Sequence, residues 1–183
     1  MYGILGEHSS DVNTLKVLVR RLIRNETLPI KIKGYSGCAQ MLRKGAEQLK
    51  AFLNLGCTRF IVCHDADGSD PEPNRERVRN RIISPSGIRS DYCIVVPVQE
   101  LEAWILADIE CATNIFSSWT PAVIHNPEAI PSPKEYLEKL SRTSRHRPRY
   151  IHAVHNEKIA EHLNLKRISQ KCPAFRELEK FVA

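Results

Sequence analysis

The fold is decided by the stretch Arg59-Phe60-Ile61-Val62-Cys63-His64-Asp65-Ala66-Asp67-Gly68, residues 59–68. Its part 60–63 is short, continuously apolar and rich in β-branched residues, which is typical of a strand covered on both faces in a parallel sheet. Asp65 and Asp67 follow at once, and Gly68 allows the chain to turn. Ligands of open α/β sheets bind beyond the carboxyl ends of the strands, and Mg²⁺ takes oxygen ligands. The stretch therefore predicts a metal site at a strand end, with a plain solvated turn as the alternative.

Strand-like and helix-like segments alternate on both sides of this stretch. The pattern predicts strands over 1–5, 29–35 and 91–98, and helices over 11–24, 36–54, 75–83 and 99–107, with a loop at 69–74 and a helix stop at 84–87. In the second strand Ile30 and Ile32 alternate with Lys31 and Lys33, which favours a sheet edge or a strand with one face open to water. Strands that alternate with helices predict an α/β fold, a mostly parallel, Rossmann-like sheet of about four strands flanked by helices.

The last part of the chain differs in pattern and in charge. Helices are predicted over 133–141, 150–163 and 173–182, with a basic loop at 142–149. Residues 134–183 contain twelve Lys and Arg against six Glu, a difference of +6 that equals the net charge of the whole chain. We therefore predict an α/β core over 1–110 and a helical, basic C-terminal extension over 111–183. Such a surface attracts phosphate backbones, although mildly basic proteins are common.

Composition narrows the class of protein. The chain has 183 residues, and no segment approaches the roughly 20 consecutive apolar residues of a membrane span. The N-terminus lacks a basic segment followed by an apolar one, so secretion is not expected. Six cysteines are scattered without a Cys-x-x-Cys pair. We predict a reduced, cytoplasmic protein with neither a membrane anchor nor a zinc site.

Further carboxylates follow the other predicted strands. Glu7 comes directly after the first strand, and Asp11 is four residues later, near the start of the following helix. Glu100 and Glu102 come after the fourth strand. The ends of neighbouring parallel strands meet at one edge, so these acids and the two aspartates are predicted to converge. Negative charge gathered there costs Coulomb energy unless a cation neutralises it, which favours a site for Mg²⁺ or Mn²⁺.

These residues carry a family resemblance. Glu after strand one and Asp-x-Asp after strand three resemble the signature of the Toprim fold of topoisomerases, primases and the nucleases of the OLD (overcoming lysogenisation defect) family. The segments Val96-Pro97-Val98-Gln99-Glu100-Leu101-Glu102-Ala103-Trp104-Ile105-Leu106-Ala107-Asp108, Pro133-Lys134 and Cys172-Pro173-Ala174-Phe175 are similar to small stand-alone Toprim-like proteins of undetermined function. Some of those relatives are associated with defence against phage. The similarity covers nearly the whole chain.

The resemblance implies a metal-dependent nuclease that cleaves phosphodiester bonds of DNA or RNA. Asp65 and Asp67 would hold the metal, and Glu7 would be a ligand or a general acid/base. Asp11 matches a second acid of OLD-type sites, and Glu100 or Glu102 would complete a two-metal site. Nucleic acid would be contacted by basic residues, for which the candidates are Lys134, Arg145, Arg147, Arg149 and Lys171. OLD proteins carry an ATPase domain before the Toprim part, so a partner ATPase is a further expectation.

Other residues of chemical interest have simpler explanations. Arginines at 75, 77, 79 and 81 would spread over two faces of a helix, which fits a solvated helix as well as a phosphate clamp. His152 and His155 are three apart on a predicted helix, where a plain helix face is more common than a metal site. His64 would tune the acidic site or point into the core. Trp104 is spaced for packing rather than for stacking on a base.

Two other classes of function remain open. A binding or sensing module with this fold would bind nucleic acid in a salt-sensitive way, without cleavage. A phosphotransfer domain of the receiver type also places acids after strand one and an aspartate after strand three, but the Glu-Leu-Glu-Ala-Trp segment and the basic tail argue against it. Haloacid-dehalogenase phosphatases place Asp-x-Asp after their first strand, which excludes them.

Overall fold

The architecture comes from a computed structural model of the whole chain, which describes residues 1–68, 70–89, 91–143 and 149–183. Within these ranges, no helix is both long enough and apolar enough to cross a bilayer. The predicted phosphate contacts Arg145 and Arg147 lie outside the described residues.

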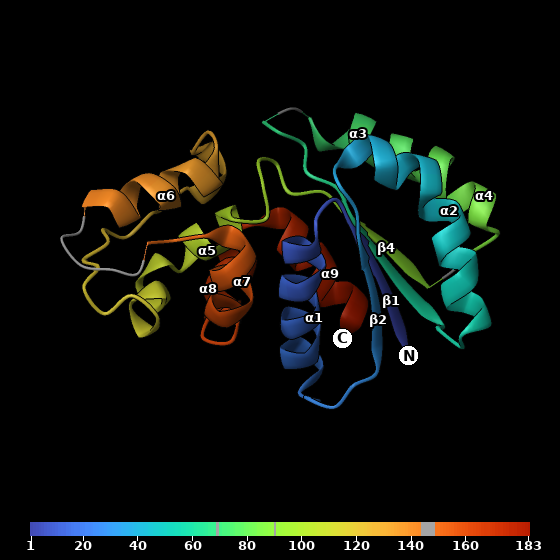
Figure 1. Cartoon of the computed structure of the whole chain (residues 1–183), viewed down its shortest axis with the longest axis horizontal. Coiled ribbons are helices and arrows are strands. Elements are labelled where there is room, and N and C mark those ends of the chain that lie inside the picture. The colour runs from blue at the N-terminus through green and yellow to red at the C-terminus, as the bar shows by residue number, and fades with distance from the viewer. Residues whose placement is uncertain (69, 90, 144–148) are drawn as a thin grey trace.

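A four-stranded, all-parallel sheet forms the centre of the molecule (Figure 1). The strands are β1 (Tyr2–Gly6), β2 (Ile30–Gly34), β3 (Arg59–Cys63) and β4 (Tyr92–Val95), in the spatial order β2-β1-β3-β4. β1 and β3 are almost fully buried, whereas half-buried and exposed residues alternate along β2. The predicted α/β fold is confirmed, and so is the edge position of the second strand.

Helices cover both faces of the sheet. They are α1 (Ser9–Ile23), α2 (Cys38–Asn54), α3 (Pro71–Val78), the π-helix η1 (Arg79–Ile83), α4 (Ser84–Ser86), α5 (Ala103–Ala107), the 3₁₀ helices η2 (Ile109–Asn114) and η3 (Pro127–Ala129), α6 (Pro133–Thr143), α7 (His152–Ala160), α8 (Leu165–Lys171) and α9 (Pro173–Val182). One apolar cluster lies under α2, η1 and α4, and a larger one joins α1 to α5 and to the C-terminal helices. Figure 1 shows these two layers on opposite sides of the sheet.

The C-terminal helices are part of the core rather than a separate unit. α7 packs on α1, and α9 returns to lie against β4 and α1. Trp104 is fully buried and meets Phe175 of α9 edge to face, with ring centroids 5.1 Å apart. The prediction that Trp104 belongs to the core is confirmed, and the expected helical extension is present.

Several predicted segment boundaries were wrong. The strand predicted over 91–98 ends at Val95, and the helix predicted over 99–107 begins only at Ala103. Residues 71–74, expected in a loop, begin α3, because Asp70 caps the helix by accepting a hydrogen bond from the Glu72 amide and Pro71 suits its first turn. The helix does not stop at Ser84-Pro85 but continues to Ser86, where Gly87 ends it at φ 80°. Proline has no amide hydrogen to donate and normally interrupts a helix. Here the π-helical turn η1 immediately before it changes the hydrogen-bond register, and the helix continues through the proline. The short helix α8 had no prediction.

The end of β2 lies against the start of α1. Gly34 pairs with Gly6, and a Cβ at position 34 would lie 2.5 Å from the Ser9 amide nitrogen and 2.7 Å from the His8 carbonyl carbon. Both are backbone atoms, so they cannot move aside as a flexible side chain would. The absence of a side chain at Gly34 therefore allows residues 7–9 to cross the strand end, and this places Glu7.

Candidate metal centre

Three neighbouring strands end at the same edge of the sheet, and acids follow each of them. β1 pairs with β3 and β3 with β4, in registers that place Leu5 beside Val62 and Cys63 beside Val95. Glu7, Asp65 and the segment 97–102 therefore leave the sheet side by side. The convergence predicted from the sequence is confirmed for these strand ends.

Asp65 lies at the centre of the acidic cluster. Burial raises the pKa of its carboxyl well above the usual range, and the charges of Asp11, Glu102, Glu7 and Glu100 raise it further. Within the described part of the chain, no hydrogen bond is donated to the Asp65 carboxylate. Asp65 is half-buried, and an ionised carboxylate beside four others costs free energy that a bound cation would lower.

Glu7 is held by the end of β3, whereas Asp11 is held by its own loop. Glu7 Oε1 accepts a hydrogen bond from the Asp65 amide at 3.1 Å, so the two strand ends are in direct contact. Asp11 Oδ2 accepts from the His8 amide at 2.9 Å, and its Oδ1 from the Ser10 hydroxyl at 3.1 Å. Asp11 is thus a buried acid in the first turn of α1, where the orphan amides favour negative charge.

The acids after β4 are held by the C-terminal helices. Glu100 Oε2 accepts from the Lys134 amide at 2.9 Å, at the start of α6. Glu102 is only 4% exposed, and its Oε1 accepts from Asn156 Nδ2 at 2.9 Å. Asn156 in turn accepts a short hydrogen bond from the Tyr150 hydroxyl. Burial raises the pKa of Glu102 to about 7, against the opposing effect of the Asn156 hydrogen bond.

Asp67 occupies a different place from Asp65. It is exposed and adopts the left-handed conformation with φ 51°, and its amide donates to Gln99 O at 3.2 Å. Its charge acts on Cys38 of α2, where it helps to raise the pKa of the thiol. Of the two aspartates, Asp65 is therefore next to the other acids, whereas Asp67 is exposed.

Within the described residues, Glu7, Cys38 and His64 form the group whose ligand atoms are close enough to share one ion; no three of the carboxylates around Asp65 meet this criterion. One ligand atom each from Glu7, Cys38 and His64 lies within 4.8 Å of the others, so this group could hold a metal ion. His64 is buried; its Nε2 lies 3.5 Å from Cys38 Sγ. Its Nδ1 lies 2.5 Å from Glu7 Oε1, in contact but without the alignment of a hydrogen bond. The 3.5 Å separation is close to the edge of a tetrahedron with Zn–S of about 2.3 Å and Zn–N of about 2.0–2.1 Å.

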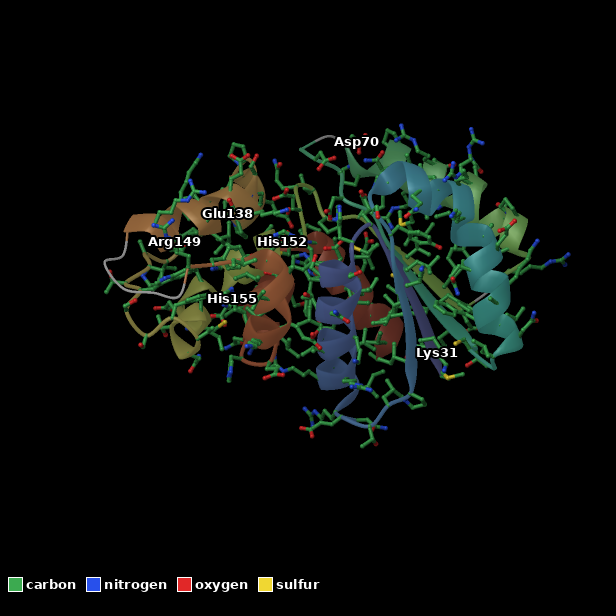
Figure 2. The ribbon with its side chains drawn as sticks, viewed as in Figure 1. Lys31, Asp70, Glu138, Arg149, His152 and His155 are labelled. Atoms are coloured by element: carbon green, nitrogen blue, oxygen red, sulfur yellow. The ribbon has the colours of Figure 1, made fainter. Side chains whose placement is uncertain are left out.

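The predicted cationic residues are spread over the molecule. Lys134 is close to the acidic cluster, since its amide donates to Glu100 Oε2 at 2.9 Å. Arg149 is exposed (Figure 2). Lys171 Nζ donates to Ala107 O at 2.8 Å and to Ile124 O at 2.7 Å, so this ammonium supports two loops.

His152 and His155 do not form a metal pair. His155 is buried against Phe116, and its Nδ1 accepts from the Ile151 amide at 2.9 Å. His152 lies at the start of α7, separate from His155 in Figure 2, and burial lowers its pKa. The simpler explanation of this pair, a helix face, agrees with the structure.

Sequence reasoning missed Cys38 and Asn156. Cys38 follows β2 at the same sheet edge as the acids, which is the signal that could have pointed to it, but scattered cysteines had suggested a chain with no cysteine at a metal site. Asn156 is far from Glu102 in sequence, and only the packing of α7 on the core brings the two together.

Comparison with protein families is informative at this point. A family model described as "Domain of unknown function (DUF4276)" matches residues 7–183, and the match begins at Glu7. The chain belongs to this family. A search of curated proteins and a search of solved structures gave no match. The match covers strands β2, β3 and β4, the acids that follow the strands and the C-terminal helices.

Proposed function

We propose that this protein is a metal-dependent nuclease of the Toprim type that hydrolyses phosphodiester bonds of DNA or RNA. The observation that carries the proposal is the position of Asp65, a half-buried carboxylate near Glu7, Asp11, Glu100 and Glu102 to which no residue in the described part of the chain donates a hydrogen bond. Acids on three adjacent strand ends, each raising the pKa of the same group, fit a divalent cation better than they fit structural ion pairs.

Mg²⁺, or Mn²⁺ in its place, suits this donor set because all five side chains offer carboxylate oxygens. Asp65 would hold the ion together with Asp11 and the free Oε2 of Glu7, and Glu100 and Glu102 offer ligands for a second ion. A bound ion would supply Lewis-acid stabilisation of negative charge on phosphoryl oxygens. Asp67, on the side of Cys38, is a ligand only if it turns toward this cluster.

Glu102 would transfer protons when only one ion is bound, and would be a ligand when a second ion is bound. In the metal-free protein its pKa of about 7 gives both protonation states near neutral pH, which is the range in which a general acid or base works best. Asn156 fixes the orientation of its carboxyl through Oε1. The remaining oxygen is available to accept or to donate a proton.

Substrate attraction would come from Lys134 and His8 at the rim of the cluster. Hydrogen bonding to Asp11 raises the pKa of His8, so this side chain carries positive charge more readily than an ordinary histidine. Both cations face a site whose net charge is negative, as expected where a phosphate and a metal ion bind together. A partner ATPase and a role in defence against phage belong to the same proposal.

The test is a cleavage assay on labelled single-stranded and duplex DNA and RNA, with Mg²⁺, Mn²⁺ or EDTA. We expect cleavage only with metal, and a loss of at least 100-fold in Asp65→Asn, since a metal ligand contributes several kcal/mol to the transition state. Glu47→Gln, an exposed acid on α2, is the control and should retain full activity. If purified Asp65→Asn cleaves as fast as the unchanged protein, the proposal is wrong.

A non-catalytic nucleic-acid-binding module is the second candidate, favoured by the net charge of +6. It predicts binding that weakens with salt, no cleavage with any metal, and no effect of Asp65→Asn on affinity. The same preparations distinguish the two functions when binding and cleavage are measured side by side.

A further inference from the structure

The four arginines of the segment 75–81 divide into two pairs with different surroundings. Arg75 donates to Ile94 O at 2.6 Å and pairs with Glu177 at 2.8 Å, and Arg79 pairs with Glu76. Both are thus engaged with acids. Residues four apart share a helix face, so Arg77 and Arg81 point the other way.

Arg77 and Arg81 line an open groove of about 620 Å³ between α2 and the helix α3–η1. The other lining residues are Cys38, Ala39, Leu42 and Arg43. All three arginines are exposed, and none of them has an acidic partner among the residues that the structure describes. Figure 1 shows α2 alongside α3 and α4 in the layer that covers this face of the sheet.

The groove adjoins the acidic cluster through a short series of side chains. Burial raises the pKa of the Cys38 thiol, and Arg77 is near enough to oppose this. Cys38 Sγ lies 3.5 Å from His64 Nε2, and His64 Nδ1 lies 2.5 Å from Glu7 Oε1. One end of the groove is therefore separated from Glu7 by two side chains, Cys38 and His64.

Three guanidinium groups without acids repel one another, and the arrangement is favourable once an anion lies between them. Guanidinium is the side-chain group best matched to phosphate, because its planar donors bind two oxygens at once. Ala39 and Leu42 add apolar surface to the groove lining. A sugar or a base could cover this surface, whereas an inorganic anion would leave it exposed to water.

We propose that this arginine groove, lined by Arg43, Arg77 and Arg81, binds phosphates of a nucleic-acid strand that flank the phosphodiester at the acidic cluster. The choice of a nucleic-acid strand as ligand rests on the proposed function. An open groove that begins beside the cluster and is lined from two helices fits a strand that continues past the site. A free nucleotide offers the same phosphate chemistry and is tested separately.

The experiment measures binding of a fluorescein-labelled single-stranded DNA and RNA oligonucleotide by anisotropy, with EDTA to prevent cleavage. The test variant is Arg43→Gln/Arg77→Gln/Arg81→Gln. The matched control, Arg24→Gln/Lys50→Gln/Lys166→Gln, removes the same charge from exposed positions elsewhere. Circular dichroism checks that both are folded, and single Arg81→Gln serves if the triple variant is not.

We expect the groove variant to lose at least 10-fold in affinity, and the control less than 3-fold. The slope of log affinity against log salt should fall by about 2 in the groove variant, at roughly 0.7 per phosphate contact of a single strand. Equal affinity of both variants would overturn the proposal. So would competition by a 5′-mononucleotide at concentrations below those of the oligonucleotide, since the ligand would then be a free nucleotide.

These outcomes separate the groove from the nuclease proposal. If binding depends on the groove arginines but no cleavage occurs in Mg²⁺ or Mn²⁺, the groove proposal stands and the nuclease proposal is wrong. Metal-dependent cleavage with unchanged binding by the groove variant retains the nuclease and rejects the groove.

Discussion

Neutralising Glu102 should stabilise the metal-free protein at high pH. Its pKa rises from the ordinary 4.5 to about 7 on folding, first because the carboxyl is buried. At about 1.4 kcal/mol per pKa unit, this corresponds to about 3 kcal/mol. The folded state binds the proton more tightly than the unfolded state, so this contribution is present in full below pH 4.5 and is lost as the pH rises through 7.

The variant Glu102→Gln removes this loss and retains the oxygen that Asn156 donates to. In EDTA at pH 8 we expect its free energy of unfolding to exceed that of the unchanged protein by up to about 3 kcal/mol. For a chain of this size that is roughly 6–12 °C in Tm, at 2–4 °C per kcal/mol. At pH 4.5 the difference should shrink toward zero. The Glu102 charge also raises the pKa of Asp65. Removing that charge lowers the free-energy cost of an ionised Asp65, which stabilises the folded variant further.

The assay is urea unfolding followed by circular dichroism at pH 4.5, 6 and 8, with Glu47→Gln as the exposed control. Excess Mg²⁺ should reverse the order at pH 8, because only the unchanged protein keeps the full set of ligands. The reasoning would be refuted if the difference in free energy of unfolding between Glu102→Gln and the unchanged protein were no larger at pH 8 than at pH 4.5.

Three further predictions follow from the same site. In thermal melts, millimolar Mg²⁺ should raise the Tm of the unchanged protein and leave that of Asp65→Asn within 1 °C, at roughly RT ln(1 + [L]/Kd) of stabilisation. Zn²⁺ should bind the Glu7–Cys38–His64 group and inhibit cleavage, because Glu7 would then no longer be available to Mg²⁺. In dose–response curves, Cys38→Ser should weaken this inhibition at least 10-fold and leave Mg²⁺-dependent cleavage intact. Gly34→Ala should cost more than about 1 kcal/mol in urea unfolding and weaken Mg²⁺ binding, because its Cβ would displace the backbone of His8 and Ser9; unchanged Mg²⁺ affinity in calorimetry would contradict this.

The α/β fold could be predicted because periodicity reports burial directly. The continuous apolar run 60–63 and the alternation of Ile30 and Ile32 with lysines are local consequences of a central and an edge position in the sheet. Boundaries near Asp70 and Pro85 could not be predicted, since they depend on a cap and on a π-turn rather than on an apolar pattern. α8 was missed because it is short and Ile168 is its one fully buried residue, so it offers little apolar periodicity.

The acidic cluster could be predicted in part. Glu7, Asp65, Glu100 and Glu102 follow strands, and the rule that parallel strands end at one edge brings them together. Their individual states could not be predicted, because these depend on tertiary partners: His64 and the Asp65 amide for Glu7, the Lys134 amide for Glu100 and Asn156 for Glu102. The division of the arginines at 75–81 likewise depends on where acids of other elements lie.

The free-energy cost of the acidic cluster is itself an argument about function. A surface acid is neutral in its effect on stability, but Asp65 and Glu102 both have raised pKa values, so each makes the folded protein less stable at neutral pH than a neutral side chain would. Contacts from the neighbouring helices keep these acids in place. Asn156 holds Glu102, and the start of α6 holds Glu100, instead of separating them from Asp65. Contacts that hold like charges together make the metal-free protein less stable, and a bound cation would offset this effect. The decisive quantity is therefore the sign of the Glu102→Gln effect with and without Mg²⁺. A reversal would identify the cluster as a metal site, whereas the same sign in both conditions would leave the acids without a cation to explain them.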